Sequence, residues 1–113
     1  MSEETTLPNW KASTTHPELA GKIRDALRQV RDPEIGSDII QLGLVREIEI
    51  SENNIVVTMI LTTPYCPYGP AMMESARRIV QDETGKSTTI IYGSEVWDQS
   101  MMEDPTAFNW GLF

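Results

Sequence analysis

Two short runs of residues decide the fold: LGLVREIEI at positions 42–50 and IVVTMILT at positions 55–62. In the first run the even positions are mostly apolar, whereas Glu47 and Glu49 stand at odd positions, which is the alternation of a strand with one buried face. The second run has β-branched residues at both parities, as expected of a central strand. Because the polar residues 51–54 between the runs favour a turn, we predict that the two strands form a hairpin.

An amphipathic helix is predicted before the hairpin. Residues 15–18, Thr-His-Pro-Glu, have the spacing of a capping box with proline in the first turn, and apolar residues then recur at helical period as far as Val30. The helix ends at Asp32-Pro33-Glu34, because the residue before a proline is disfavoured in helical geometry. Residues 35–38 are then predicted to form a turn.

A second helix and a third strand are predicted after the hairpin. Pro70 is a favourable first-turn residue and Gly85 a favourable residue at a helix end, so the helix spans this interval. Residues 88–92 form the last strand. The order helix, strand, strand, helix, strand predicts an α/β (α+β) fold, a two-layer sandwich in which the helices cover one face of a small mixed sheet. The apolar stripe of the second helix consists of Met72, Ala76, Ile79 and Val80.

Composition excludes several classes of function. The chain has 113 residues, 40% of them hydrophobic, and 9 Lys and Arg against 17 Asp and Glu give a net charge of −8. This acidity disfavours binding to nucleic acid and to anionic membranes. No apolar run approaches the roughly 20 residues of a membrane helix. No Gly-rich phosphate loop or Ser–His pair is present, so classical hydrolase or kinase chemistry is not expected.

The compartment follows from the single cysteine and the first residues. One cysteine forms no intramolecular disulfide, and the N-terminal Met-Ser-Glu-Glu is acidic where a secretory signal is basic and apolar. A cytoplasmic protein is therefore expected. One Cys and one His also cannot form a usual zinc site by themselves.

Both ends of the chain are interpreted from composition. Residues 1–14 are polar and without periodicity, so they are predicted to be a flexible leader, and docking of Leu7 and Trp10 on the domain is the alternative. Residues 15–113 are predicted to form a single domain. Apolar residues persist in the acidic C-terminal part, and this aromatic tail is predicted to pack on the domain or form an interface. They are Val96, Trp97, Phe108, Trp110, Leu112 and Phe113.

The lone cysteine, Cys66, lies in the loop between the central strand and the second helix. A thiol near a helix N-terminus is favoured as the thiolate, the form that attacks or binds metal. Thr63, Pro64 and Pro67 are expected to support this loop, because proline stiffens the backbone. The prolines disfavour burial of the loop as regular structure, so an accessible sulfur is predicted. A small buried hydrophobic residue is the alternative reading of Cys66, and it has equal weight.

Several segments together resemble a known family, the metal–sulfur cluster assembly factors, also called PaaD-like or SufT-like proteins. The resemblance rests on DPEIGSDIIQLGLV at residues 32–45 and on TTPYCP at residues 62–67. The resemblance as a whole covers roughly residues 17–113, and it is looser near the C-terminal end. The chain departs from the family pattern where many members have Pro-Pro-Trp after the last strand, since residues 93–97 are Gly-Ser-Glu-Val-Trp. Asp104-Pro105 interrupts what is often a terminal helix.

The resemblance implies participation in iron–sulfur cluster maturation, with Cys66 as the reactive or cluster-binding residue and Asp32 as an acidic residue of the site. It implies binding and delivery without enzymatic turnover, with no catalytic residue and no tightly bound cofactor. The metal contact would be a transient iron–sulfur cluster on Cys66. The implied partners are the cluster assembly machinery and client apoproteins.

The chemistry of the residues limits this expectation. A cluster ordinarily needs four protein ligands and the chain has one thiolate, so a homodimer is expected to bring two copies of Cys66 together. Turn formation accounts for Glu34, whereas for Asp32 a ligand role and a turn role stay equally open. Two other functions are retained: a thiol or persulfide carrier acting through Cys66, and a non-catalytic PaaD-like accessory subunit in which Cys66 is structural.

Overall fold

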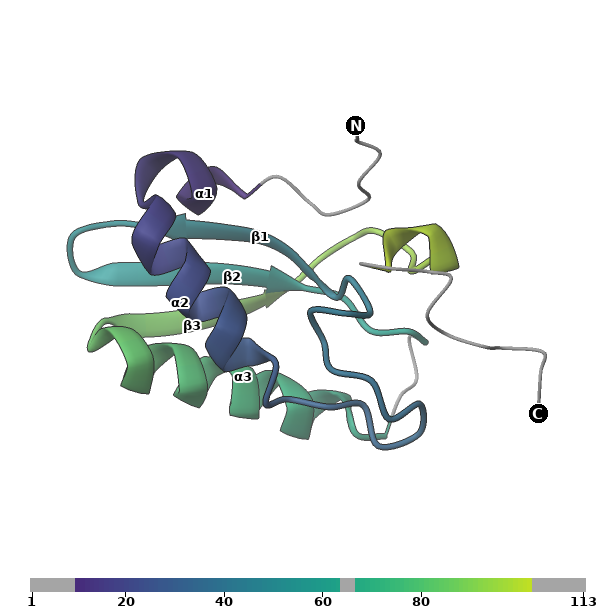
Figure 1. Ribbon diagram of the computed structural model, residues 1–113. Coiled ribbons are helices and arrows are strands. Elements are labelled where there is room, and N and C mark those ends of the chain that lie inside the picture. Colours follow the sequence, from purple (N-terminus) through teal and green to yellow (C-terminus); the bar gives the residue numbers. More distant parts are fainter. Residues whose placement is uncertain (1–9, 64–66, 103–113) are drawn as a thin grey trace.

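A computed structural model describes residues 10–63 and 67–102 of the chain (Figure 1). The predicted order of helix, strand, strand, helix and strand is confirmed by α2 to β3, and two short elements, α1 and η1, are added to it. The elements are α1 (Lys11–Thr15), α2 (Pro17–Leu27), β1 (Val45–Ile50), β2 (Asn54–Met59), α3 (Gly69–Thr84), β3 (Ser87–Tyr92) and the 3₁₀ turn η1 (Gln99–Met101).

The sheet has three strands in the order β1-β2-β3, so β2 is central as predicted. β1 and β2 are antiparallel and form the predicted hairpin, in whose turn the Ser51 N–H donates to the Asn54 carbonyl oxygen at 2.8 Å. β3 is parallel to β2, because α3 returns the chain along the sheet before β3 begins. The predicted small mixed sheet is confirmed.

Helices α2 and α3 contact each other and cover one face of the sheet (Figure 1). The opposite face carries half-buried or exposed side chains such as Glu49, Val56 and Thr89. The two-layer sandwich with helices on one face is therefore confirmed. Its core contains Ile23 and Leu27 of α2, Ile48 of β1, Val57 and Met59 of β2, and Met72, Ala76 and Val80 of α3.

Both strands of the hairpin are shorter than predicted. β1 begins at Val45 instead of residue 42, and its register with β2 shifts between Val45 and Glu47. β2 ends at Met59 instead of residue 62. The flanking Leu44 and Ile60 are fully buried, and the Ile60 N–H still donates to the Leu44 carbonyl oxygen at 2.8 Å. The apolar pattern thus predicted correctly which residues are buried. It did not predict where the hydrogen-bonded strands begin and end.

The leader predicted over residues 1–14 is corrected for its last part. Trp10 is 2% exposed, and its indole N–H donates to the Val45 carbonyl oxygen at 3.0 Å. The Arg24 guanidinium of α2 lies 4.3 Å from the centroid of the Trp10 ring, so a cation–π contact closes the other side of the indole. Lys11 then opens α1. Residues 1–9 lie outside the described part of the chain.

The capping box predicted at residues 15–18 is not formed. His16 is the N-cap of α2 and no side chain caps the helix, although Pro17 occupies its first turn as predicted. The end of α3 follows the prediction closely, because Gly85 ends it in the left-handed conformation at φ +72°.

The described part of the C-terminal tail packs on the domain. The Trp97 indole N–H donates to the Leu42 carbonyl oxygen at 2.6 Å, and Met102 is fully buried. Val96, in contrast, is 83% exposed. Phe108, Trp110, Leu112 and Phe113 lie outside the described residues, so the prediction that they form an interface stays a prediction.

Candidate functional site

The cysteine loop is described only at its two ends. Pro64 and Cys66 lie outside the described residues, so the predicted accessibility of the sulfur remains a prediction. Thr63 precedes the loop, Pro67 is exposed after it, and α3 begins at Gly69. The two ends are held close together, because a Cβ built on Gly69 would lie 2.5 Å from Cδ1 of Leu61.

Asp32 is fully buried in the turn that follows α2. Its Oδ1 accepts the backbone N–H of Glu34 at 2.9 Å and that of Ile35 at 3.4 Å. Its own carbonyl oxygen accepts the Gly36 N–H at 2.7 Å. One carboxylate oxygen therefore fixes the local turn, which is the turn role considered for Asp32 in the sequence.

The other carboxylate oxygen of Asp32 faces the cysteine loop. The Thr62 hydroxyl donates to Oδ2 at 3.5 Å, across 30 positions of sequence. Thr62 stands four positions before Cys66, so the buried carboxylate and the entry to the cysteine loop are adjacent in space. A single long hydrogen bond leaves Oδ2 able to accept another. Burial of a carboxylate is costly unless it is paired, and no Lys or Arg of the described residues forms an ion pair with Asp32.

The acidic neighbours of Asp32 have ordinary roles. Glu34 is exposed and contributes its backbone N–H to the Asp32 turn, in agreement with the turn role predicted for it. Asp38 accepts the backbone N–H of Gln41 at 2.8 Å and lies 3.6 Å from the Arg28 guanidinium. Of the two acidic residues considered in the sequence, the structure therefore brings only Asp32 to the loop.

Gly43 lies in close contact with η1. Its φ is +75°, and a Cβ at this position would collide with the Met101 carbonyl oxygen of η1. A side chain is thus excluded both by the backbone conformation and by the contact. The Trp97–Leu42 hydrogen bond lies beside this contact, so residues 97–101 pack against the turn at Leu42 and Gly43.

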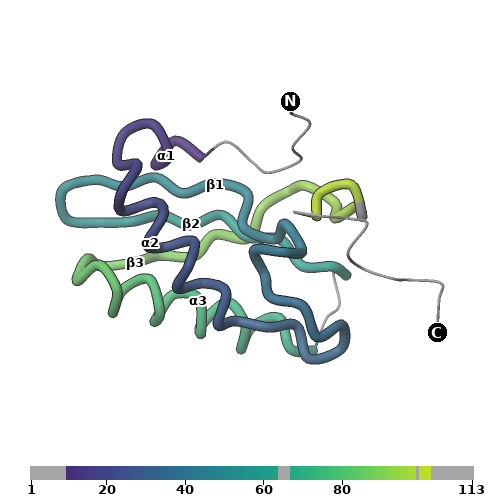
Figure 2. Tube along the Cα trace, in the orientation of Figure 1, coloured from purple at the N-terminus to yellow at the C-terminus, as the bar shows by residue number. Residues whose placement is uncertain are grey.

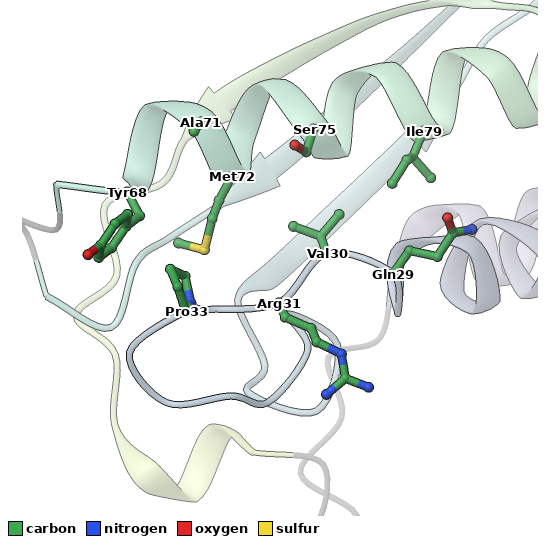
Figure 3. Close-up of a pocket in the computed structure, with 9 residues that line it drawn as sticks. All are labelled: Gln29, Val30, Arg31, Pro33, Tyr68, Ala71, Met72, Ser75 and Ile79. Carbon is green, nitrogen blue, oxygen red and sulfur yellow. The ribbon is translucent and has the colours of Figure 1, made fainter.

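An open groove of about 330 Å³ lies between the Asp32 turn and the first half of α3 (Figure 3). Val30, Arg31 and Pro33 line one side, and Tyr68 and Met72 stand opposite, with Tyr68 44% exposed. Sequence analysis did not identify this groove. A signal was present, since the small residues Ala71 and Ser75 recur at helical spacing on the same side of α3 and leave room beside it.

Residues 10–63 and 67–102 contain no group of three or more His, Cys, Asp or Glu side chains that could hold a metal ion. Of the helices that the structure describes, none is both long and apolar enough to cross a membrane.

A protein family and two relatives that match this chain have names that refer to iron–sulfur clusters or to Fe-S protein maturation. A family model described as iron-sulfur cluster assembly protein matches residues 21–90. The Fe-S protein maturation auxiliary factor YitW of Bacillus subtilis is 38% identical over 65 residues, which are 57% of this chain and 64% of that protein. The Fe-S protein maturation auxiliary factor SufT of Staphylococcus aureus is 33% identical over 76 residues, 65% of this chain and 86% of that protein.

The fold has been seen before. The crystal structure of a domain of unknown function, DUF59, from Bacillus anthracis superposes with a TM-score of 0.76, covering 89% of this chain and 99% of that chain at 24% sequence identity. At that identity the similarity establishes the fold alone. The matched stretch spans less than two thirds of YitW, so the activity of the whole protein is a matter for proposal.

Proposed function

Because the chain belongs to the iron–sulfur cluster assembly protein family, we propose that it serves as a maturation factor that carries or delivers a cluster transiently through Cys66. The observation that carries this proposal is the hydrogen bond from Thr62 to the buried Asp32 carboxylate. It ties an acidic group to the entry of the loop that contains the only cysteine of the chain.

Asp32 is suited to assist a thiol. Oδ1 accepts two backbone N–H groups, which fix the carboxylate in the turn, while among the described residues Oδ2 has only the long contact with Thr62. In this proposal the fixed oxygen at the entry to the cysteine loop accepts hydrogen bonds from the incoming cargo, while Cys66 binds metal as the thiolate. Asp32 is also an oxygen donor, poorer than cysteine for iron, which suits a cluster that must leave again.

Transient carriage agrees with the number of ligands. One thiolate and one carboxylate leave a cluster short of the four protein ligands it usually has. The remaining ligands must come from a small thiol, an assembly partner or the client, so the cargo is held loosely and passed on. The partners are therefore the assembly machinery and client apoproteins, in a reducing compartment such as the cytoplasm. This is a binding and delivery role without turnover.

A second candidate, a thiol or persulfide carrier, is favoured by the start of α3. Its N-cap is Tyr68, and within the part of the chain that the structure describes no side chain caps the helix, so its first-turn N–H groups favour an anion nearby. Cys66 precedes this helix by three residues in sequence. A thiolate there would attack the outer sulfur of a donor persulfide, so that Cys66 becomes the persulfide and the donor leaves as a thiolate, with no iron involved.

Anaerobic loading with iron and sulfide separates the two candidates. For a cluster carrier we expect visible absorption and bound iron that are lost in Cys66→Ser and reduced in Asp32→Asn, while Glu34→Gln, the exposed neighbour, behaves as wild type. For a sulfur carrier we expect no bound iron but rapid alkylation of Cys66 at pH values below the usual thiol range. A protein with neither iron binding nor fast alkylation would refute both candidates and leave the accessory subunit.

A further inference from the structure

The groove beside α3 is an apolar surface with a positive charge at its rim (Figure 3). Val30, Met72 and Ile79 contribute apolar side chains to it, and so does the ring of Tyr68, the N-cap of α3. Among the described residues that line the groove, Arg31 has the one charged side chain. The groove therefore suits an apolar segment that carries carboxylates at one end.

The charge of Arg31 lies on the turn side of the groove. The side chain is exposed and extends away from α3 (Figure 3). Its Nη1 donates to the Gly36 carbonyl oxygen at 2.9 Å, which holds the guanidinium along the turn after α2. A guanidinium has five N–H donors in a fork that fits a carboxylate, so the bond to Gly36 leaves room for a carboxylate as a second partner.

The described part of the chain ends close to the turn side of the groove. Met101 touches the turn at Gly43. From that turn, the Leu44 N–H donates to the Ile39 carbonyl oxygen at 2.9 Å, and the Ile39 N–H donates to the Val30 carbonyl oxygen at 2.9 Å. Because hydrogen-bonded backbone segments lie about 5 Å apart, the backbone of Val30 is roughly 10 Å from that of Leu44.

The sequence that follows has the composition that the groove suits. Residues 103–113, EDPTAFNWGLF, begin with two carboxylates and contain no Lys or Arg. Phe108, Trp110 and Leu112 stand at alternate positions, so they share one face of an extended segment. Pro105 favours an extended backbone at the residue before it. An extended segment of this sequence thus offers negative charge first and an apolar face afterwards.

We propose that residues 103–113 bind in this groove of their own chain. The carboxylates of Glu103 and Asp104 lie toward Arg31, and the ring of Trp110 lies between α3 and the turn after α2. The six residues from 103 to 108 span at most about 22 Å, which is enough to reach the groove from the turn at Gly43. Aromatic side chains bury large apolar areas, so the rings supply most of the gain.

The connection to the same chain favours this occupant over a free partner of the same chemistry. A short link between two binding parts gives an effective concentration in roughly the millimolar range, whatever the concentration of the protein. Residues 103–107 are such a link, because they join the buried Met102 to the aromatic residues. Weak intrinsic affinity is therefore sufficient for the segment to bind.

Charge favours the groove over the open face of the sheet. Ile91 is 48% exposed on that face and offers apolar area there. The same face carries the carboxylate of Glu49, which pairs with Lys11 at 2.8 Å. An acidic segment would meet a carboxylate on the open face, whereas in the groove it meets Arg31.

Binding of this segment needs no iron, so the proposal stands or falls independently of the proposed function. Tyr68 follows Cys66 by two residues, so the bound segment lies beside the end of the cysteine loop. A partner that uses the same groove must displace it.

A nitroxide label on the iron-free, full-length chain tests the proposal. Asn109→Cys in the Cys66→Ser background provides one thiol for the label, next to both aromatic rings. Methyl signals in NMR spectra broaden where the label lies near. We expect strong broadening at Val30 and Met72 in the groove, and much weaker broadening at Ile91 on the open face.

Two variants of the labelled chain separate ring contacts from charge. Trp110→Ser removes an aromatic side chain and should lower the ratio of bound to unbound segment by about tenfold or more. Arg31→Glu should lower this ratio by about twofold to fivefold, as expected of an exposed ion pair. Lys22→Glu, the same change of charge at an exposed position of α2, is the matched control and should leave the ratio unchanged.

Broadening that is absent or strongest on the open face would overturn the proposal, and so would equal losses in Lys22→Glu and Arg31→Glu. Broadening seen only when labelled chains are mixed with isotope-labelled chains would do the same, because the segment would then bind a second copy.

If Cys66→Ser or Arg31→Glu does not fold, Trp110→Ser in the otherwise unchanged chain decides, since it alters no described residue of the groove. Trp110→Ser should shift the methyl signals of Val30 and Met72. Unshifted signals would equally contradict binding of the segment in the groove.

Discussion

The two ends of the sheet are built differently (Figure 2). At one end, the β1–β2 turn and the α3–β3 connection are short, and Lys86 joins them by donating to the Glu52 carbonyl oxygen at 2.5 Å. At the other end, three segments distant in sequence meet: the turns after α2, the residues around the cysteine loop and the chain leading into η1. That end contains the buried Asp32 and the close contact at Gly43.

The two ends of the sheet therefore have different roles: one supports the fold, and we expect the other to contain the functional site. The simple end is satisfied by backbone hydrogen bonds and a glycine helix end, as the fold requires. The crowded end holds a buried carboxylate that pairs with no cation of the described residues, and a backbone contact that leaves no room for a side chain at Gly43. Buried charges and tight backbone contacts that the fold must accommodate are commonly found at functional sites. We therefore expect changes at the crowded end to affect stability and function in distinct ways.

The largest expected loss of stability follows substitution of Gly43, which is compared with Gly85 because the two glycines have similar backbone conformations. Gly43→Ala should lower the free energy of unfolding by about 2–5 kcal/mol, because a left-handed residue costs about 1–2 kcal/mol and displacement of Met101 adds a packing cost. Gly85→Ala, at the simple end with open space around it, should cost only the first term, about 1–2 kcal/mol. Urea unfolding measures both, and equal losses would show that the Gly43–Met101 contact does not matter.

A smaller loss is expected at Asp32. Asp32→Ala removes the acceptor of two backbone N–H groups and should cost about 1–3 kcal/mol, whereas Asp32→Asn keeps an acceptor and should cost less. Asp32→Asn should nevertheless slow cluster delivery, because an amide is a weaker ligand for a metal ion than a carboxylate. If Asp32→Asn delivers at the wild-type rate, the carboxylate serves the turn alone.

The smallest effect concerns Asp98, which precedes η1. Hydrogen bonds from the Ser100 hydroxyl and backbone N–H lower the pKa of Asp98 below its ordinary value of 3.8. The folded state therefore gains stability that is fully present above pH 3.8 and is lost as the pH falls through the lowered pKa. Asp98→Asn should reduce the urea midpoint slightly at pH 7 and not at all below that pKa. A difference that persists in strong acid would assign the effect to packing.

Sequence patterns predicted α2, the hairpin, α3 and β3, because each has the apolar period of its element and a clear boundary residue such as Pro70 or Gly85. Trp10 was assigned to the leader because the residues before it have no period. Its burial depends on Val45 and Arg24, which belong to other elements. A single docked side chain leaves no periodic signal.

The site was predictable only in part. The turn at Asp32 follows from Pro33, and the resemblance singled out Asp32 and Cys66. That Asp32 is fully buried and meets Thr62 depends on how the α2–β1 turn packs beside the end of β2, and the strand order was not derivable from sequence. The groove beside Tyr68 likewise arises between two elements and belongs to neither pattern alone.

The most direct test of the account is anaerobic cluster transfer from the loaded protein to an iron-free client, comparing wild type with Cys66→Ser. We predict that wild type delivers a cluster and that Cys66→Ser delivers none while keeping the wild-type urea midpoint, because Cys66 serves transfer and not packing. Transfer by Cys66→Ser at the wild-type rate would contradict the account. A large loss of stability in Cys66→Ser would instead assign the cysteine to the core.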